Sequence, residues 1–270
     1  RMLRISAGIY VSSDHLIFTD ALGIAPTREV LRRVEALAQR QDFPMPFSRA
    51  ITQSSRPGDC LGFYAGALAG EWNHASLREM QPHFVLFVQN TMQQTLAQHV
   101  LQAAGLLNGR IEHGTSGTVQ PWETGFVLDA RGESITILDT YGAPDDSAQL
   151  LLRCQALLED GAKMLVVPVD APRTLERLAG ASDAHVHRVR TAPEAFMQAL
   201  LQTLPEEAAM RQLDLHFDGL SAMLALLQLL ASRRTTLRGL LATQPPIFRR
   251  TTVVDCPFPD KGRILRELAA

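Results

Sequence analysis

The chain has 270 residues, 46% of which are hydrophobic, and its formal net charge is −2. A chain of this length and composition can bury one large core or two smaller ones, as globular proteins do. Its near-neutral charge and its short basic pairs, which lack interleaved aromatic residues, exclude the usual electrostatic basis for nucleic-acid binding. We therefore expect no nucleic-acid partner.

The cysteines, Cys60, Cys154 and Cys256, are far apart and form no C-x-x-C pair. This pattern argues against a zinc site and a disulfide framework, and it favours a reducing, cytoplasmic compartment. No uncharged apolar stretch approaches the ~18 residues that span a bilayer, and no export signal begins the chain, so we expect no membrane partner. Because the first residues run directly into a strand-like segment, we expect a piece of a longer protein.

Residues 1–81 predict a pair of strands, two helices and a loop. Short apolar or alternating runs at 4–11 and 15–20 are typical of paired strands. Residues 27–40 switch to helical spacing, with Thr27 as the predicted N-cap. Residues 41–58 are rich in Pro, Ser and Gly and predict a loop, and a second helix is expected at 59–70.

From Pro82 onward, predicted strands and helices alternate. Strands are expected at 83–88, 125–129, 134–139, 163–169 and 185–189, and the second and third are joined by a turn-forming tetrapeptide at 130–133. Helices are expected at 95–107, 148–161, 172–180, 193–202 and 217–231. This order is typical of layered α/β domains with a largely parallel sheet.

Ordered motifs in the second half of the chain resemble a known family. GFVLDARGESITILD at 125–139, LLEDG at 157–161, LVVPVDA at 165–171 and HVHRVRTAPEAF at 185–196 resemble the second and third domains of the α-D-phosphohexomutases. FDGLSAMLALL at 217–227, followed by VVDCPFPDKGRILR at 253–266, is similar to the phosphomannomutase-like half that some bacteria carry fused to mannose-1-phosphate guanylyltransferase. The resemblance covers most of the chain, firmly from about Gly125 onward.

The resemblance implies two to three layered α/β domains of phosphohexomutase type, with mixed, largely parallel sheets. A partial domain I-like segment is expected at 1–81, a domain II-like segment at 82–142, and a domain III-like segment with a C-terminal extension at 143–270. Members of the family are isomerases that move a phosphate between C1 and C6 of a hexose through a phosphoserine. Mg²⁺ on an aspartate loop neutralises the charge that phosphoryl transfer spreads over the phosphate oxygens.

The metal loop of active members resembles D-G-D-G-D-R, and the matching stretch here is 129–134. The resemblance places Asp129 and Glu133 on the first and third metal-ligand positions, but Arg131 occupies the middle one and Ser134 replaces the terminal arginine. A cation where a ligand belongs repels a metal ion, and it forms a local ion pair more easily than it completes a divalent site. The sequence leaves Mg²⁺ open as a cofactor, but it favours a polar hairpin turn over a metal site at 129–134.

The nucleophile loop of active members reads T-A-S-H-N-P, and the resemblance aligns it with Ser12-Ser13-Asp14-His15. Asp14 falls on the phosphorylated serine and His15 on the histidine, while the following N-P is absent. Ser13 is a neighbouring phosphate acceptor, and an aspartyl phosphate on Asp14 is a chemical alternative. A shortened strand-to-strand turn is the favoured interpretation.

The sugar-selecting loop of active members, of G-E-x-S-G-H type, corresponds here to MRQLDLHFDG at 210–219. His216 and Asp218 are the candidate substrate-binding residues, although Asp218 precedes an apolar helix and fits equally well as its N-cap. The R-x-S-G-T phosphate-binding loop with which the family begins its fourth domain is not in the chain.

Two other patterns carry less weight. HGTSGT at 113–118 is rich in glycine and hydroxyl groups and could cradle a phosphate, but it opens no obvious helix and lacks the P-loop lysine, so a plain loop is favoured. A remote alternative pairs Cys60, near a helix N-terminus that would lower its pKa, with His113 or His74 as a Cys/His hydrolase.

The altered loops lead to a functional hypothesis. We expect a degenerate, non-catalytic phosphomannomutase-like module, linked to sugar-nucleotide synthesis of the GDP-mannose type, that stabilises or regulates a nucleotidyltransferase domain or subunit. The alternative is an active, Mg²⁺-dependent phosphohexomutase, so the sequence leaves open whether the chain is an enzyme. A sugar phosphate is the expected small ligand, and the sequence leaves homo-oligomer formation open.

Overall fold

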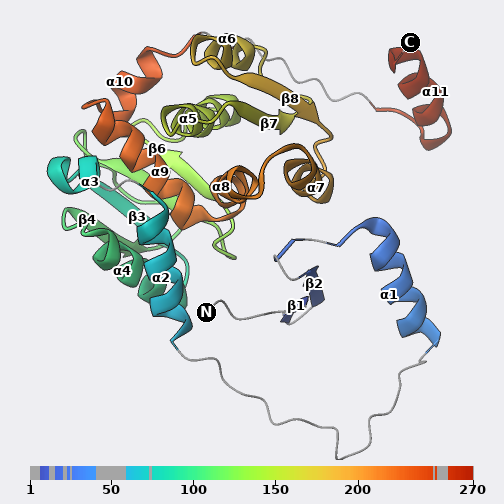
Figure 1. The fold of residues 1–270 in the computed structure, drawn as a ribbon, viewed down its shortest axis with the longest axis horizontal. Helices are drawn as coiled ribbons and strands as arrows, with labels where there is room; N and C mark the ends of the chain where they lie inside the picture. The colour runs from blue at the N-terminus through green and yellow to red at the C-terminus, as the bar shows by residue number, and fades with distance from the viewer. Residues whose placement is uncertain are drawn as a thin grey trace, which may run out of the picture.

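The computed structural model describes residues 7–11, 16–20, 23–24, 26–40, 59–72, 75–245, 247 and 255–269. Figure 1 shows a body of helices and strands built from the middle of the chain, with α1 (Arg28–Arg40) and α11 (Phe258–Ala269) standing apart from it. Thr27 Oγ1 accepts a hydrogen bond from Val30 N at 3.3 Å, which confirms the predicted N-cap of α1. The strands β1 (Ala7–Val11) and β2 (Leu16–Asp20) form the predicted pair, which is antiparallel.

The larger sheet has four strands in the order β4-β3-β5-β6. The central strand β3 (Phe84–Val88) pairs in parallel with β4 (Gly109–His113) and β5 (Thr124–Leu128), and β5 pairs antiparallel with β6 (Ile135–Leu138). Every residue of β3 is buried, as its continuous apolar run predicts. Gly132 has a φ of +80° in the predicted turn between β5 and β6, where glycine is favoured.

The smaller sheet consists of the parallel strands β7 (Met164–Pro168) and β8 (His185–Val189), which are connected through α6 (Thr174–Ala181). A helix, α8 (Glu206–Phe217), covers the other edge of β7. Gln212 Oε1 accepts from Val166 N at 3.1 Å, and Gln212 Nε2 donates to Met164 O at 2.6 Å. This carboxamide makes the pair of bonds that a neighbouring strand would otherwise make.

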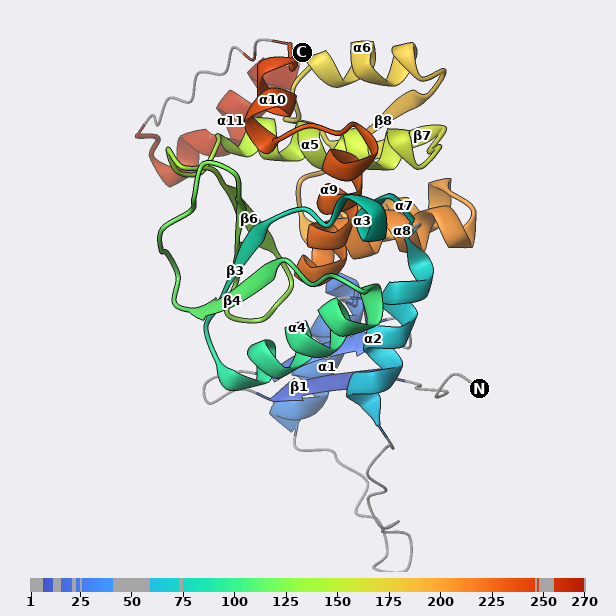
Figure 2. The same ribbon diagram turned by 90° about the vertical axis from the view of Figure 1, so that its left-hand side faces the viewer.

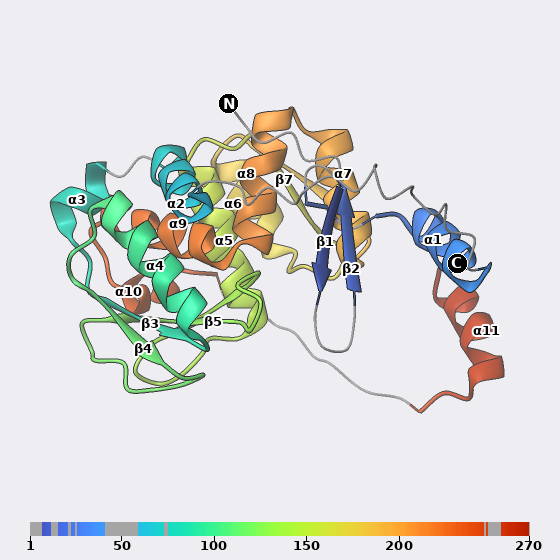
Figure 3. The ribbon, with the colours of Figure 1, turned by 90° about the horizontal axis from the view of Figure 1, so that it is seen from below.

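The helix α9 (Gly219–Ser232) lies at the centre of the body, between α2 (Cys60–Glu71) and α5 (Asp146–Glu159), as Figures 1 and 3 show. Every residue of α9 except Gln228 and Ser232 is buried. It contacts β5 and β6 of the larger sheet as well as α5, so both sheets share one hydrophobic core.

The remaining helices surround this core, as Figure 2 shows, and comprise α3 (Ala75–Met80), α4 (Thr91–Ala104), α7 (Pro193–Thr203) and α10 (Leu237–Ala242). The sequence pattern did not predict α3, β4, α8, α10 or α11. In the described part of the chain, no single helix is long and apolar enough to cross a membrane. The helices α8 and α9 meet that criterion only together, and they are bent by 100° at the break between them.

Candidate functional site

The turn after β5 lies at the carboxyl ends of the parallel strands β3 and β5, where open α/β sheets bind ligands. Asp129 begins this turn and is engaged within it. Its Oδ1 accepts from Glu133 N at 2.9 Å, and its Oδ2 accepts from Ser134 Oγ at 2.9 Å. Both oxygens of the first predicted metal ligand therefore hydrogen-bond to groups of the turn itself.

The second predicted metal ligand, Glu133, faces the guanidinium group of Arg131 in the same turn. Arg131 Nη1 lies 3.7 Å from Glu133 Oε1, which is the local ion pair expected from the sequence. Among the described residues, no three His, Cys, Asp or Glu side chains are grouped so that they could hold a metal ion. Mg²⁺ requires hard oxygen ligands in octahedral geometry, and a turn with a self-bonded aspartate and an arginine does not fit that requirement.

Two glutamines, the buried Gln93 and the exposed Gln89, hold the backbone of this turn in place. Gln93 Nε2 donates to Asp129 O at 2.6 Å and to Ala130 O at 3.2 Å, and Gln89 Nε2 donates to Leu128 O at 3.0 Å. Gln93 Oε1 in turn accepts from Gln89 N at 2.8 Å. The carbonyl oxygens that could supplement a metal site are thus also hydrogen-bonded.

The tertiary structure brings this turn against the junction of α8 and α9. Gly219 N donates to Gly132 O at 2.9 Å, so two segments that are far apart in the sequence lie side by side. Asp218 Oδ1 accepts from Leu220 N and Ser221 N, both at 3.0 Å, which confirms its predicted role as an N-cap. Its Oδ2 accepts a hydrogen bond of 2.5 Å from Tyr64 OH of α2.

An acidic cluster extends from Asp218 along the contact of α2 with α8. Burial, reinforced by the nearby Asp214, raises the pKa of Glu71 to about 8, although Arg211 opposes this shift. Burial also raises the pKa values of Asp214 and Asp218. A side-chain hydrogen bond links Glu71 to Asp214, so Glu71 keeps its proton at neutral pH and donates it to the Asp214 carboxylate.

His216, the other candidate substrate-binding residue, has different neighbours from Asp218. Its ring meets the ring of Phe196 in α7 edge-on, with 5.0 Å between centroids. Burial lowers the pKa of His216 to about 3, so the imidazole is neutral at pH 7. Its Nε2 is buried and has no hydrogen-bond partner among the described residues. His216 therefore contributes to the packing of α7 against α8.

The remaining sequence candidates are dispersed. Ser13, Asp14 and His15 lie outside the described residues, as does His74. Cys60 is exposed at the start of α2, and His113 Nε2 bonds to Gln94 Oε1 at 2.8 Å. In the 113–118 loop, a Cβ on Gly117 would lie 2.2 Å from Phe87, so close packing explains that glycine.

Sequence reasoning did not identify Tyr64, Glu71, Asp214 or Gln93 as parts of this region. No sequence signal links Tyr64 to Asp218, because 154 positions separate them. A local signal existed only for Gln89 and Gln93, which lie four positions apart, just before α4 and in its first turn.

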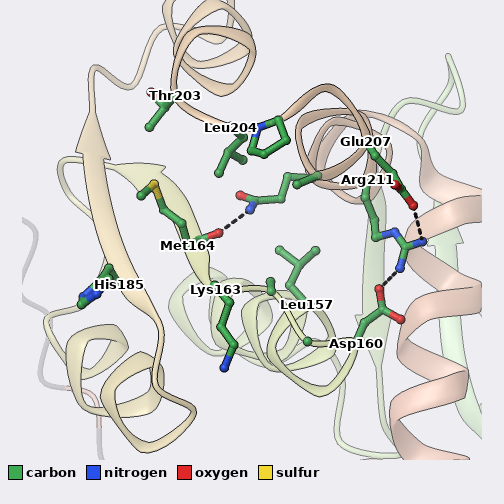
Figure 4. A pocket seen from close by; sticks show the side chains of 14 residues that line it. Leu157, Asp160, Lys163, Met164, His185, Thr203, Leu204, Glu207 and Arg211 are labelled. Atoms are coloured by element: carbon green, nitrogen blue, oxygen red, sulfur yellow. Dashed lines mark hydrogen bonds and ion pairs between the residues drawn. The ribbon is translucent and has the colours of Figure 1, made fainter.

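A hollow of about 580 Å³, drawn in Figure 4, lies elsewhere in the body. Met164 and His185, the first residues of β7 and β8, line it, so it lies at the amino ends of these strands. Figure 4 shows His185 on one side and Arg211 beside Asp160 and Glu207 on the other. Its wall is otherwise largely apolar, and it is separate from the turn of the candidate site.

The chain has a mixed α/β fold with largely parallel sheets, as predicted, and solved structures of phosphomannomutase and phosphoglucomutase type share this fold. The crystal structure of a candidate phosphomannomutase from Thermus thermophilus is similar, with a TM-score of 0.66 and 15% identity over 84% of this chain and 58% of that chain. A phosphoglucomutase/phosphomannomutase family protein from Burkholderia thailandensis gives a TM-score of 0.64 and 15% identity over 86% and 55% of the two chains.

The chain thus spans little more than half the length of these two structures. No family model and no curated protein matches its sequence. At this level of identity, the likeness establishes the fold.

Proposed function

We propose that this chain is a non-catalytic module of phosphohexomutase fold, linked to sugar-nucleotide synthesis of the GDP-mannose type, that stabilises or regulates a nucleotidyltransferase domain or partner. The observation that carries the proposal is the self-contained turn at 129–134. Asp129 bonds to Glu133 N and Ser134 Oγ, and Arg131 pairs with Glu133. Phosphoryl transfer needs positive charge beside the phosphate oxygens. In this turn the charged side chains are instead paired with groups of the turn.

The helix α8 gives a second argument. It occupies the stretch in which the sequence resemblance places the sugar-selecting loop. Its Gln212 bonds to the backbone of β7, and Asp218, which follows it, caps α9 and accepts from Tyr64. These side chains serve the fold, which supports a structural role for this segment rather than sugar selection.

A coupled assay tests the catalytic part of the proposal. Mannose 1-phosphate and glucose 1-phosphate are supplied with Mg²⁺ and a hexose bisphosphate activator, and 6-phosphate formation is followed. We expect no turnover from the wild-type chain. Clear turnover, abolished by Asp129→Asn but not by Asp139→Asn outside the turn, would establish the alternative, an active phosphohexomutase.

The turn itself can be tested by a change of charge. Arg131→Asp restores an acid at the middle position, so we expect weak binding of Mn²⁺, used as a spectroscopic probe in place of Mg²⁺, to appear in the variant only. Arg131→Ala is the matched control, because it removes the cation without adding a ligand. Mn²⁺ binding to the wild-type turn, measured by paramagnetic broadening of NMR signals from 129–134, would contradict the proposal.

The partner part of the proposal needs a separate measurement. A GDP-mannose-forming nucleotidyltransferase is heated alone and with the chain, and its midpoint of unfolding and its activity are recorded. We expect the chain to raise that midpoint or to change that activity, because a ligand of the folded state stabilises it by mass action. An unchanged midpoint and activity at excess chain would count against this part alone.

A further inference from the structure

Another hollow, of about 330 Å³, lies at the amino ends of β3, β4 and β5, at the opposite end of the sheet from the 129–134 turn. We call it the Trp122 hollow, after the aromatic residue in its wall; its polar wall residues include His83, Asn108, Glu123, Arg234 and Thr235. A smaller hollow of about 120 Å³ adjoins it, since Glu123 and Thr236 line both, and it is lined by Tyr141 and Arg238. The larger volume lies within the range of small-ligand sites.

Two aromatic rings at these hollows are unusually exposed. Trp122 is 62% exposed and Tyr141 is 76% exposed, whereas Trp72, the other tryptophan of the chain, is 4% exposed. Arg238 lies 4.5 Å from the centroid of the Tyr141 ring and donates to its hydroxyl at 2.9 Å. An exposed tryptophan beside a hollow contributes little to the core, and it offers a flat apolar surface for a ligand.

The polar groups of the Trp122 hollow offer both donors and acceptors. Glu123 is held by Arg110, at 2.8 and 2.9 Å, and is therefore engaged. Asn108 Nδ2 donates to Gln81 O at 3.0 Å, which leaves the Asn108 amide oxygen without a donor among the described residues. Arg234 uses one guanidinium nitrogen on Glu79 at 3.2 Å, and its other guanidinium N–H groups have no acceptor among the described residues.

We propose that the Trp122 hollow binds a hexopyranose ring. The C–H bonds on one face of a pyranose are weakly positive, so that face stacks on the negative face of the Trp122 ring. Hydroxyl groups both donate and accept hydrogen bonds, which matches the Asn108 amide oxygen and the Arg234 guanidinium. The proposal is independent of the proposed function. Trp122, Asn108 and Arg234 belong neither to the 129–134 turn nor to the glutamines that hold it.

The arrangement favours a sugar over a nucleobase, which also stacks on aromatic rings. The polar groups come from three separate elements, namely the residue before β3 (His83), the residue before β4 (Asn108) and the connection between α9 and α10 (Arg234). A pyranose carries hydroxyl groups around its whole edge, whereas a base makes its hydrogen bonds along one or two edges.

Quenching of tryptophan fluorescence by acrylamide in the full chain tests the proposal. Because Trp72 is buried and donates to Ser221 Oγ at 3.2 Å, the quenchable signal comes from Trp122. We expect methyl α-mannoside or methyl α-glucoside, at millimolar concentrations, to protect Trp122 from quenching in a saturable way. Phe63→Ala, which removes another aromatic ring of similar exposure (64%) on α2, is the matched control and should leave this protection unchanged.

Because Trp122→Ala lacks the fluorescent reporter, its binding of the same glycosides is measured by NMR titration. Trp122→Ala and Asn108→Ala should each weaken binding about tenfold, as expected for one stacking contact or one hydrogen bond. Circular dichroism checks that both variants stay folded. The absence of saturable protection by either glycoside would overturn the proposal, as would protection by GMP without protection by the glycosides, which would indicate a base-binding site.

Discussion

Glu71 and Asp214 face each other across the contact of α2 with α8, next to the hydrogen bond between Tyr64 and Asp218. Two carboxylates in a half-buried setting cannot both ionise without repulsion, so Glu71 retains its proton. Arg211 moderates this repulsion and lies 5.6 Å from the ring centroid of Trp72. The contact of α2 with α8 therefore includes one protonated carboxyl group.

This proton makes the stability of the protein depend on pH. The pKa of Glu71 is raised from 4.5 to about 8, so the folded state binds more protons than the unfolded state within that window. The free energy of unfolding should therefore be highest below pH 4.5, as far as Glu71 is concerned, and this contribution should be lost as the pH rises through 8. Urea unfolding at a series of pH values measures the slope.

Glu71→Gln mimics the protonated acid and should flatten the fall in stability toward pH 8. Glu35→Gln, on the exposed α1, is the control and should leave the slope unchanged. A Glu71→Gln protein with the wild-type pH dependence would show that the Glu71 proton does not set this slope.

At the scale of elements, the first residue of α9, Gly219, packs against the 129–134 turn. The hydrogen bond from Gly219 N to Gly132 O requires close approach of the two backbones. A Cβ on Gly219 would lie 2.3 Å from Leu128 Cδ1 and 3.0 Å from Ser134 O. The contact thus depends on the absence of a side chain at one helix position.

Gly219→Ala should lower the free energy of unfolding by roughly 1–3 kcal/mol, because the added methyl group forces the turn away from α9. Gly66→Ala, in α2, is the matched control, since no atom lies within 4 Å of a Cβ at that position. It should raise stability by roughly 0.5–1 kcal/mol through helix propensity. Chemical denaturation of both variants gives the comparison, and equal stability of Gly219→Ala and wild type would refute the tight contact.

The helix α8 was not predicted from the sequence. The sequence resemblance placed a sugar-selecting loop at 210–219, whereas α8 runs from Glu206 to Phe217. Its helical spacing of Ala209 and Leu213 is local, but the demand for Gln212 comes from the uncovered edge of β7. That edge exists because the smaller sheet has two strands in the described part of the chain, and this depends on how the chain is connected.

At the scale of the whole molecule, α9 joins the two sheets through one core. It contacts β5 and β6 of the larger sheet and α5, and the same buried cluster includes residues of β7 and α6. The boundary predicted at 142/143 would separate these sheets into different domains. We expect the described body at 59–245 to unfold as one cooperative unit despite that boundary, because neither sheet can keep its core without α9.

Leu224→Ala, at a fully buried position of α9, should lower the free energy of unfolding by about 2–5 kcal/mol. Circular dichroism and the fluorescence of Trp72, in a Trp122→Phe background, should report the same transition. Leu107→Ala, at an 82% exposed position, is the control and should change stability by no more than about 0.5 kcal/mol. Two separated transitions would show that the sheets unfold as independent domains.

The sequence by itself determined the features that arise from neighbouring residues. Hydrophobic period and glycine placement predicted β3, β5, β6, α5 and α9, because such patterns act over one element at a time. The Asp218 cap and the pairing of Arg131 with Glu133 were predictable for the same reason, since each involves residues within three positions of each other.

Only the tertiary structure decided the contacts between distant segments. Tyr64 meets Asp218, Gly219 meets Gly132, and Gln212 meets the edge of β7, because the strand order and the position of α9 bring them together. The Trp122 hollow likewise combines residues from the starts of three strands and from the connection after α9. No local sequence pattern predicts these long-range contacts, because they depend on the path of the whole chain.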